Sequence, residues 1–114
     1  MNQPPGQDVF DDLFEVLEQR KSAAPHQSYV ARLYAGGAPA INAKIMEEAH
    51  EACQAALAGN RSHLTHEICD LLFHAFVLAA CGNVSLADIR GELRRRFGTS
   101  GIEEKARRAP RHNE

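Results

Sequence analysis

The sequence predicts an all-α domain, an antiparallel helical bundle. Apolar residues recur at helical spacing in four stretches of the 114-residue chain. Period-two alternation, which is typical of half-buried strands, is nearly absent, and the sequence contains no Asn-Gly hairpin signal. The tight connection at Gly59 and Asn60 makes the two longest stretches antiparallel neighbours.

A first helix is expected over about 9–21. Residues 1–7 before it are rich in Pro, Gln and Gly and are expected to be flexible, and Asp8 is suited to cap the helix N-terminus. The apolar stripe of this helix comprises Val9, Phe10, Leu13, Phe14, Val16 and Leu17. The Ala-Ala-Pro sequence at 23–25 ends the helix, and a short helical or irregular segment follows at 28–34, closed by Gly36 and Gly37.

Two long helices are expected over about 39–58 and 62–81. Pro39 suits the first turn of the former, and Gly59 suits its C-terminal cap. The apolar positions of both helices recur at helical spacing: Ile41, Ile45, Ala49, Ala52, Ala56 and Leu57, then Leu64, Ile68, Leu71, Leu72, Ala75, Phe76 and Leu78. A last helix is expected over about 86–97, where Ser85 and Asp88 resemble a capping box and Gly98 ends the helix.

Composition limits the classes of partner. A net charge of -2 provides no basic field for nucleic acid or for an anionic membrane surface. No apolar run approaches the roughly 20 residues that span a bilayer, and the N-terminus lacks the features of a signal peptide, so a soluble cytoplasmic protein is expected. Three cysteines without a C-x-x-C pair favour reduced, buried thiols: Cys53, Cys69 and Cys81.

The most informative residues are acids on the two long helices. The first helix carries E-E-x-x-E as Glu47, Glu48 and Glu51, and the second carries E-x-x-D as Glu67 and Asp70. At about 100° per residue, Glu51 lies ~60° from Glu48 and ~40° from Glu47 on the helix wheel, and Glu67 and Asp70 lie ~60° apart. Each helix therefore carries one acidic patch, and antiparallel packing can bring the two patches face to face. Converging carboxylates repel one another, and hard cations such as Mg²⁺ or Mn²⁺ compensate this repulsion and neutralise a triphosphate.

Solvated helix faces are the alternative interpretation of these acids. Apolar neighbours at Ile68, Leu71 and Leu72 favour an interior cleft instead. Lys44, one turn before Glu47, is either an ordinary ion-pair partner or a phosphate clamp.

Two histidines and a polar segment leave similar alternatives open. His74 and His63 lie one turn from the acids of the second helix, where each is a partner of an acid, a substrate contact or a satisfied polar residue. Arg32, with Ser28 and Tyr29, forms either a phosphate-binding set or an ordinary loop.

At these residues the sequence resembles the all-α, MazG-like nucleotide pyrophosphohydrolases, and within them the phosphoribosyl-ATP pyrophosphohydrolases of histidine biosynthesis. The matching stretches read S-Y-V-A-R-L at 28–33, K-I-M-E-E-A-H-E at 44–51, A-A-L-A-G at 55–59, E-I-C-D-L-L-F-H at 67–74 and S-G-I-E-E-K at 100–105. They imply one family domain over 8–108, followed by a disordered tail at 109–114. His50 and Cys53 depart from the pattern, because aliphatic residues are common at these family positions.

The resemblance implies hydrolysis of phosphoribosyl-ATP to phosphoribosyl-AMP and pyrophosphate, with Mg²⁺ (or Mn²⁺ as a substitute), in a helical homodimer whose core is completed by dimerisation. By position, the metal ligands would be Glu48, Glu51, Glu67 and Asp70. Glu47 would hold a further metal or orient the attacking water, which makes Glu47, Glu48 and Glu51 the catalytic set. The substrate contacts would be Arg32, Lys44, Tyr29 and His74. Some members carry a fused cyclohydrolase domain; we expect none here, and therefore expect association with a separate phosphoribosyl-AMP cyclohydrolase.

Three other functions are considered. A MazG-like housekeeping enzyme that cleaves dNTPs or other NTPs would share the acids and differ in its base pocket. A redox di-iron bundle would use Glu47-x-x-His50, but the second helix has Asp70 where this design needs a histidine. A non-catalytic dimerising bundle would leave the acids without a catalytic role.

Overall fold

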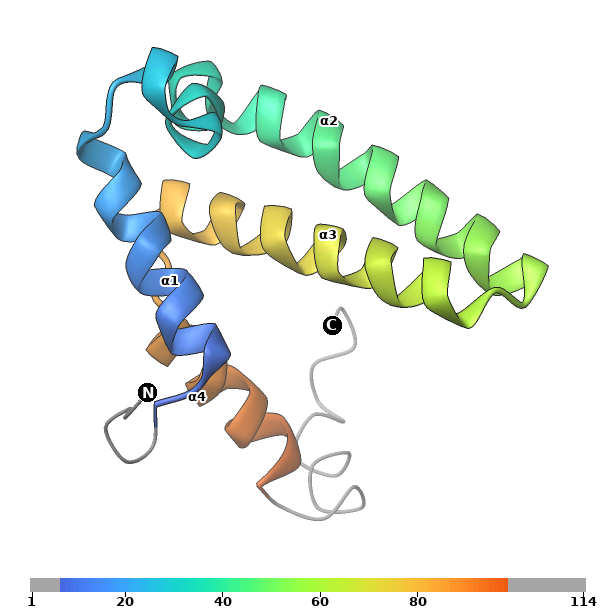
Figure 1. Ribbon diagram of the computed structural model, residues 1–114. Helices are drawn as coiled ribbons and strands as arrows, with labels where there is room; N and C mark the ends of the chain where they lie inside the picture. Colours follow the sequence, from blue (N-terminus) through green and yellow to red (C-terminus); the bar gives the residue numbers. More distant parts are fainter. Residues whose placement is uncertain (1–6, 99–114) are drawn as a thin grey trace. The chain divides into compact units, whose positions relative to one another are not determined.

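A computed structural model of the chain describes residues 7–98, and within this range it is helical with no strand. Its elements are α1 (Val9–Gln19), the 3-10 turns η1 (Arg20–Ser22) and η2 (Pro25–Gln27), α2 (Tyr29–Ala58), α3 (Arg61–Cys81) and α4 (Leu86–Phe97) (Figure 1). The all-α prediction is confirmed. The predictions for 1–6, for the motif at 100–105 and for the tail at 109–114 lie outside the described residues.

Helix α1 begins where the sequence predicts. The Asp8 carboxylate accepts hydrogen bonds from the backbone N–H groups of Phe10 and Asp11, at 3.0 and 3.1 Å, and so satisfies two donors at the helix end. Phe14 is buried and contacts Phe76 of α3 with the ring centroids 5.3 Å apart. The predicted stripe is only partly core, because Val9 is 68% exposed.

Helix α2 contains a kink that explains why the sequence shows two segments. Gly37 has φ 74° and ψ -170°, which is far from helical, and Pro39 follows in the first turn after the kink. The segment at 28–34 is helical and begins at Ser28, whose hydroxyl accepts from the backbone N–H of Ala31. Before the kink, the Tyr34 hydroxyl donates to the backbone carbonyl of Leu17 at 2.8 Å, and burial raises the pKa of Tyr34 to about 12.

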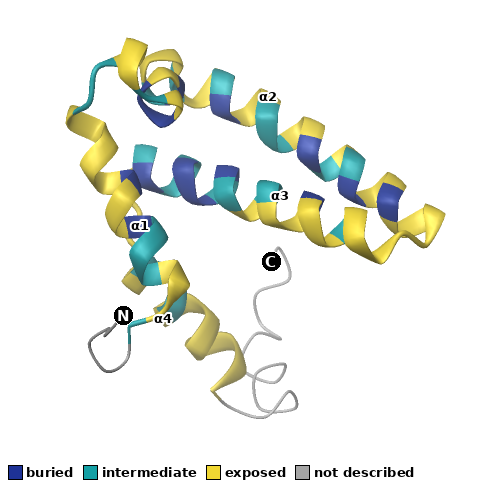
Figure 2. Ribbon diagram, in the orientation of Figure 1, coloured by how far each residue is buried: buried dark blue, intermediate teal, exposed yellow. Residues whose placement is uncertain are grey.

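Helices α2 and α3 lie side by side, joined by the left-handed Gly59 and by Asn60, which caps α3. Their facing sides form most of the core, and the buried apolar residues include Ile41, Ala52, Ala55, Val77 and Ala80 (Figure 2). Their outer sides are not all polar: Leu57 is 88% exposed and Met46 is 70% exposed.

One expectation from the sequence, that the three cysteines are buried, is wrong. Cys53 and Cys69 are exposed and Cys81 is intermediate, so the free thiols are not buried. Apolar residues line both the inner and the outer faces of these helices, so an apolar stretch does not locate the core. By length and composition alone α3 could also cross a membrane, although a core helix of a soluble protein passes the same test.

Ser85 begins a second compact unit, in which only α4 belongs to the described residues. The predicted capping box is confirmed: the Ser85 hydroxyl accepts from the Asp88 N–H at 3.0 Å, and Asp88 accepts from the Ser85 N–H at 2.9 Å. Glu92 accepts hydrogen bonds from Arg95 and Arg96, which lower its pKa to about 2.

Candidate active site

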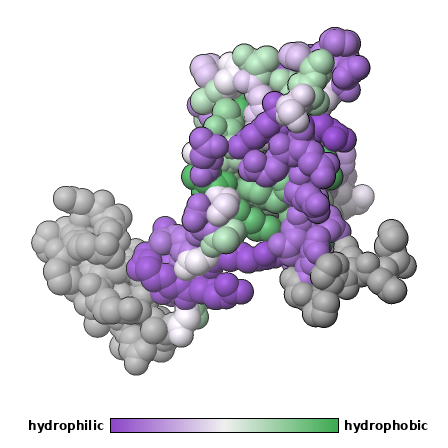
Figure 3. All heavy atoms as spheres, turned by 90° about the vertical axis from the view of Figure 1, so that its left-hand side faces the viewer, coloured by the Kyte–Doolittle hydropathy of each residue, from purple (hydrophilic) through white to green (hydrophobic). Residues whose placement is uncertain are grey.

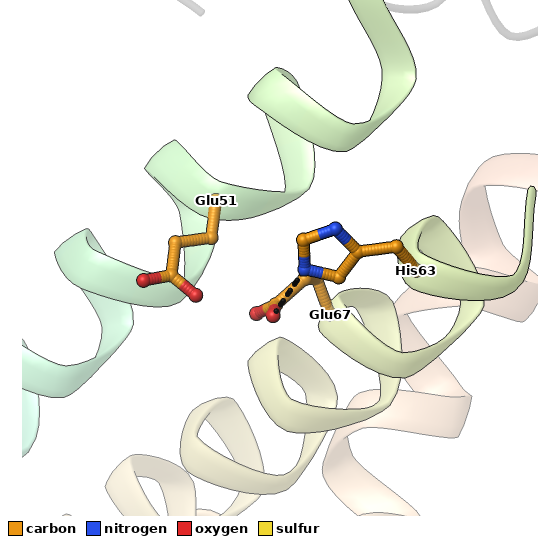
Figure 4. A group of neighbouring side chains, drawn as sticks. All are labelled: Glu51, His63 and Glu67. Atoms are coloured by element: carbon orange, nitrogen blue, oxygen red, sulfur yellow. Dashed lines mark hydrogen bonds and ion pairs between the residues drawn. The ribbon is translucent and has the colours of Figure 1, made fainter. Parts of the chain in front are cut away.

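Two carboxylates from different helices face each other across the α2–α3 pair, toward the end at which Gly59 and Asn60 join the helices. Glu51 of α2 and Glu67 of α3 point toward one another, and His63 lies beside Glu67 (Figure 4). The negative charge of the nearby Glu67 is the main cause that raises the pKa of Glu51. The pair therefore resists full ionisation unless a cation lies between the two groups.

Glu67 is the buried member of this pair, with an exposed fraction of 4%. Its Oε2 contacts His63 Nε2 at 3.1 Å. Its Oε1 is buried and has no hydrogen-bond partner among the described residues. A buried carboxylate oxygen without a partner is unfavourable, and this orphaned oxygen is suited to accept a metal ion.

Glu67 also joins a second group of potential ligands on α3. Its carboxylate, His66 and Asp70 offer ligand atoms that all lie within 4.8 Å of one another, as do those of Glu51, His63 and Glu67. Within the second group, His66 Nε2 lies 3.2 Å from Asp70 Oδ2. The structure thus brings three of the four predicted metal ligands, Glu51, Glu67 and Asp70, into two groups that share Glu67.

Glu48, the fourth predicted ligand, is buried and contacts a histidine. His74 Nδ1 lies 2.9 Å from Glu48 Oε1 and 3.0 Å from the backbone oxygen of Asp70. Because a backbone carbonyl only accepts, Nδ1 carries the proton, and Nε2 of the neutral ring accepts from the Tyr29 hydroxyl at 2.8 Å. The Asp70 carbonyl thus places a proton on Nδ1 of His74, and this N–H also faces Glu48.

The remaining predicted residues lie on the solvent side. Lys44 Nζ donates to Glu47 Oε1 at 3.1 Å, and this hydrogen bond is the main cause that raises the pKa of Lys44. Arg32 is exposed: its guanidinium lies 5.9 Å from the centroid of the Tyr29 ring and donates to the Pro25 carbonyl. Neither Glu47 nor Arg32 belongs to the two groups of potential ligands described above.

Sequence reasoning missed His66 and left the role of His63 open between an acid partner, a substrate contact and a satisfied polar residue. The available signal was the spacing of four residues, which places His63 beside Glu67 and His66 beside Asp70 on one helix face. His50, which the di-iron interpretation requires, instead contacts Gln54 on the exposed side of α2.

The donor set fits a hard divalent cation. Carboxylate oxygens are the ligands that Mg²⁺ and Mn²⁺ prefer, and a cation would relieve both the Glu51–Glu67 repulsion and the unpaired Glu67 oxygen. The half-buried Lys44, which is paired with Glu47, supplies positive charge for an anionic substrate. The arrangement suits chemistry on a metal-bound phosphate chain.

Known proteins match nearly all of this region. A family model described as phosphoribosyl-ATP pyrophosphohydrolase matches residues 10–97. Three relatives are named phosphoribosyl-ATP pyrophosphatase. The one from Rhizorhabdus wittichii is 50% identical over 100 residues, 88% of this chain and 94% of the relative. The relative from Methylococcus capsulatus is 50% identical over 101 residues, which cover 89% of this chain and 96% of the relative. The relative from Nitrosospira multiformis is 46% identical over 101 residues, which cover 89% of this chain and 84% of the relative.

Proposed function

The chain belongs to the phosphoribosyl-ATP pyrophosphohydrolase family, and we propose on this basis that it hydrolyses phosphoribosyl-ATP to phosphoribosyl-AMP and pyrophosphate in histidine biosynthesis. The observation that carries the proposal is the match over residues 10–97, which includes every acid of the α2–α3 cluster. A cytoplasmic location agrees with this role.

The residues that would hold Mg²⁺ or Mn²⁺ are Glu48, Glu51, Glu67 and Asp70. Support comes from the facing carboxylates of Glu51 and Glu67 and from the orphaned Glu67 oxygen. When bound, the metal neutralises charge on the triphosphate and lowers the pKa of an attacking water. The chain itself positions the ligands, because α2 and α3 hold the two acidic patches opposite one another.

The side chains around the cluster have separate proposed roles in catalysis, substrate binding and positioning. Glu47 is exposed beside the cluster, where its carboxylate can orient the attacking water and accept its proton. Lys44 and Arg32 would contact phosphates, and Tyr29 is exposed enough to contact substrate. His74 is only 5% exposed and both ring nitrogens have partners, so we assign it to holding Glu48 rather than to touching substrate.

The test is pyrophosphate release by the purified protein from phosphoribosyl-ATP and from a panel of dNTPs, with and without Mg²⁺. Metal-dependent release from phosphoribosyl-ATP, with little from the dNTPs, is expected. Preferential cleavage of dNTPs would instead place the protein with the housekeeping enzymes.

The site assignment is tested separately with Glu51→Gln and Asp70→Asn. Each variant is expected to lose hydrolysis and to keep its helicity in circular dichroism, because each removes one charged oxygen ligand without changing size. Unchanged turnover in either variant would refute the assigned site.

Assembly is part of the proposal. Met46 and Leu57 of α2, 11 residues apart and so within about 20° on the helix wheel, are both exposed apolar residues. Ile68 and Leu72, one turn apart on α3, are 41% and 39% exposed. We propose that a second copy covers these faces in a homodimer. A separate phosphoribosyl-AMP cyclohydrolase, which would consume the product, is a proposed further partner.

A further inference from the structure

A cavity is lined in part by Tyr29, whose hydroxyl contacts His74, the partner of Glu48, and most of its other lining residues have no role assigned so far. Its volume is about 520 Å³, within the range of about 300–1,000 Å³ that is common for small-molecule sites. It lies where the end of α1, the two 3-10 turns and the start of α2 meet α3. Figure 3 views this end of the molecule and shows hydrophobic residues bordered by hydrophilic ones.

The cavity walls suit a flat ring with polar substituents. Val16 supplies aliphatic surface, and the rings of Tyr29 and Phe73 lie nearly parallel, with centroids 6.5 Å apart and an interplanar angle of 18°. Arg20 and Gln27 add hydrogen-bond donors. Aromatic faces with a few polar groups are typical of sites that bind a heterocyclic base.

Tyr29 joins this cavity to the acid cluster. One side of the residue lines the cavity, while its hydroxyl donates to His74, which contacts Glu48. Lys44 is also close enough to Tyr29 for the two to interact electrostatically. A nucleotide whose phosphate chain lies at the acids and Lys44 can therefore reach the cavity past Tyr29.

The charge on the cavity wall indicates which end of the substrate lies there. Arg20 is exposed and makes no ion pair within residues 7–98, and Arg32 lies against the Tyr29 ring. A guanidinium without a carboxylate partner is suited to bind a phosphate monoester. Phosphoribosyl-ATP carries such a group on its second ribose, away from the triphosphate.

We propose that this cavity binds the purine and the attached phosphoribosyl group, with Arg20 contacting the phosphate monoester. The inference rests on the proposed function and deepens it: the cavity, rather than the acids, distinguishes phosphoribosyl-ATP from ATP.

The first test compares Arg20→Gln with Lys21→Gln, since Lys21 is the adjacent cation and does not line this cavity. Arg20→Gln is expected to raise the KM for phosphoribosyl-ATP by about ten- to hundredfold, the loss of one charge-assisted hydrogen bond, with Mn²⁺ affinity unchanged in calorimetry. Lys21→Gln is expected to leave the KM near wild type. Equal KM values for both variants would overturn the role of Arg20.

A second pair of variants fills the cavity. Val16→Trp places a large ring in it, whereas Val9→Trp changes an exposed position of the same helix outside it. Only Val16→Trp is expected to raise the KM. If Val16→Trp instead changes the oligomeric mass in light scattering, the cavity is a contact between subunits and the proposal is wrong.

A binding measurement separates this inference from the proposed function. Calorimetry with phosphoribosyl-AMP and with AMP is expected to show tighter binding of phosphoribosyl-AMP, and Arg20→Gln is expected to reduce that difference. A wild-type protein that binds both equally contradicts the cavity assignment even if it hydrolyses phosphoribosyl-ATP. A wild-type protein that prefers phosphoribosyl-AMP but fails to hydrolyse phosphoribosyl-ATP supports the cavity and refutes the proposed activity.

Discussion

The Glu67 carboxylate is buried on α3, it faces Glu51 of α2, and one of its oxygens has no partner among the described residues. Each of these features destabilises the metal-free fold, because each makes the negative charge of the buried Glu67 carboxylate less favourable than it would be in water. The same features favour a cation between the helices. Stability and proposed function are therefore opposed at this position.

We expect Glu67→Gln to raise the melting temperature of the metal-free protein. The amide removes the charge that repels Glu51 and offers an N–H to the Glu51 carboxylate. The increase in melting temperature on adding Mg²⁺ should be lost at the same time. Thermal melts with and without Mg²⁺ measure both effects, and Glu15→Gln, at an exposed position of α1, is the control for which neither should change.

The pH dependence of stability follows from the same pair. The pKa of Glu51 is raised from 4.5, mainly by the charge of Glu67. An acid with a raised folded-state pKa contributes stability that is present below its unfolded pKa and is lost as the pH rises through the folded value. Urea titrations of the metal-free protein should therefore show stability falling as the pH rises above 4.5, and less so in Glu67→Gln. If stability falls equally with rising pH in the wild type and in Glu67→Gln, titratable groups other than the Glu51–Glu67 pair cause the fall.

His74 offers a second prediction at this scale. His74→Ala leaves the buried Glu48 without its nitrogen partner, so the free energy of unfolding should fall by about 1–3 kcal/mol. His66→Ala removes an exposed histidine and should change stability by at most about 0.5 kcal/mol. Chemical denaturation compares the two variants. Similar losses of unfolding free energy would show that the buried contact with Glu48 contributes no more to stability than the exposed contact of His66.

At the scale of elements, Gly37 determines how α2 is divided. Its φ of 74° with ψ of -170° is a conformation that only glycine adopts without strain, so Gly37→Ala should cost about 1–3 kcal/mol. Gly91 lies inside α4 with open space where a Cβ would point, so Gly91→Ala should stabilise by about 0.5–1 kcal/mol. Denaturant unfolding measures the free energy of unfolding of both variants, which should fall for Gly37→Ala and rise for Gly91→Ala.

Helix boundaries were predictable because short-range chemistry fixes them. Asp8 and Ser85 cap α1 and α4 in the structure as their positions in the sequence indicate, and Gly59 is left-handed at the end of α2. These features depend on residues within one turn of each other. The sequence showed the interruption at Gly36 and Gly37 but could not show that the chain continues as helix on both sides of it.

The site was predictable only in part. Spacing places Glu48 and Glu51 on one helix face, but it cannot show that Glu48 is buried against His74 while Glu51 faces Glu67. The link from Tyr29 to His74 spans 45 residues of sequence, and the cavity is lined by residues of five elements. Such contacts depend on tertiary packing between residues far apart in the chain, so no short-range pattern in the sequence indicates them.

At the scale of the whole molecule, the core formed by the described residues, 7–98, leaves apolar side chains exposed on both long helices. A domain of this size is expected to bury only about two-thirds of its unfolded surface. Contiguous exposed apolar residues are unfavourable in a monomer and are typical of interfaces. The exposed Ile68 is adjacent to Glu67, so an interface on this face would adjoin the acid cluster.

The proposed homodimer predicts that Ile68→Lys combined with Leu72→Lys will be monomeric, because a second copy would have to bury two lysines. Light scattering should give twice the chain mass for the wild type and for Val9→Lys, which adds a charge at an exposed position of α1. A monomeric wild type, or a dimeric double variant, would reject this interface. Measuring Mn²⁺ affinity in the monomeric variant then separates two roles for pairing: unchanged affinity means that one chain holds the metal alone, and lost affinity means that the second copy maintains the acid cluster.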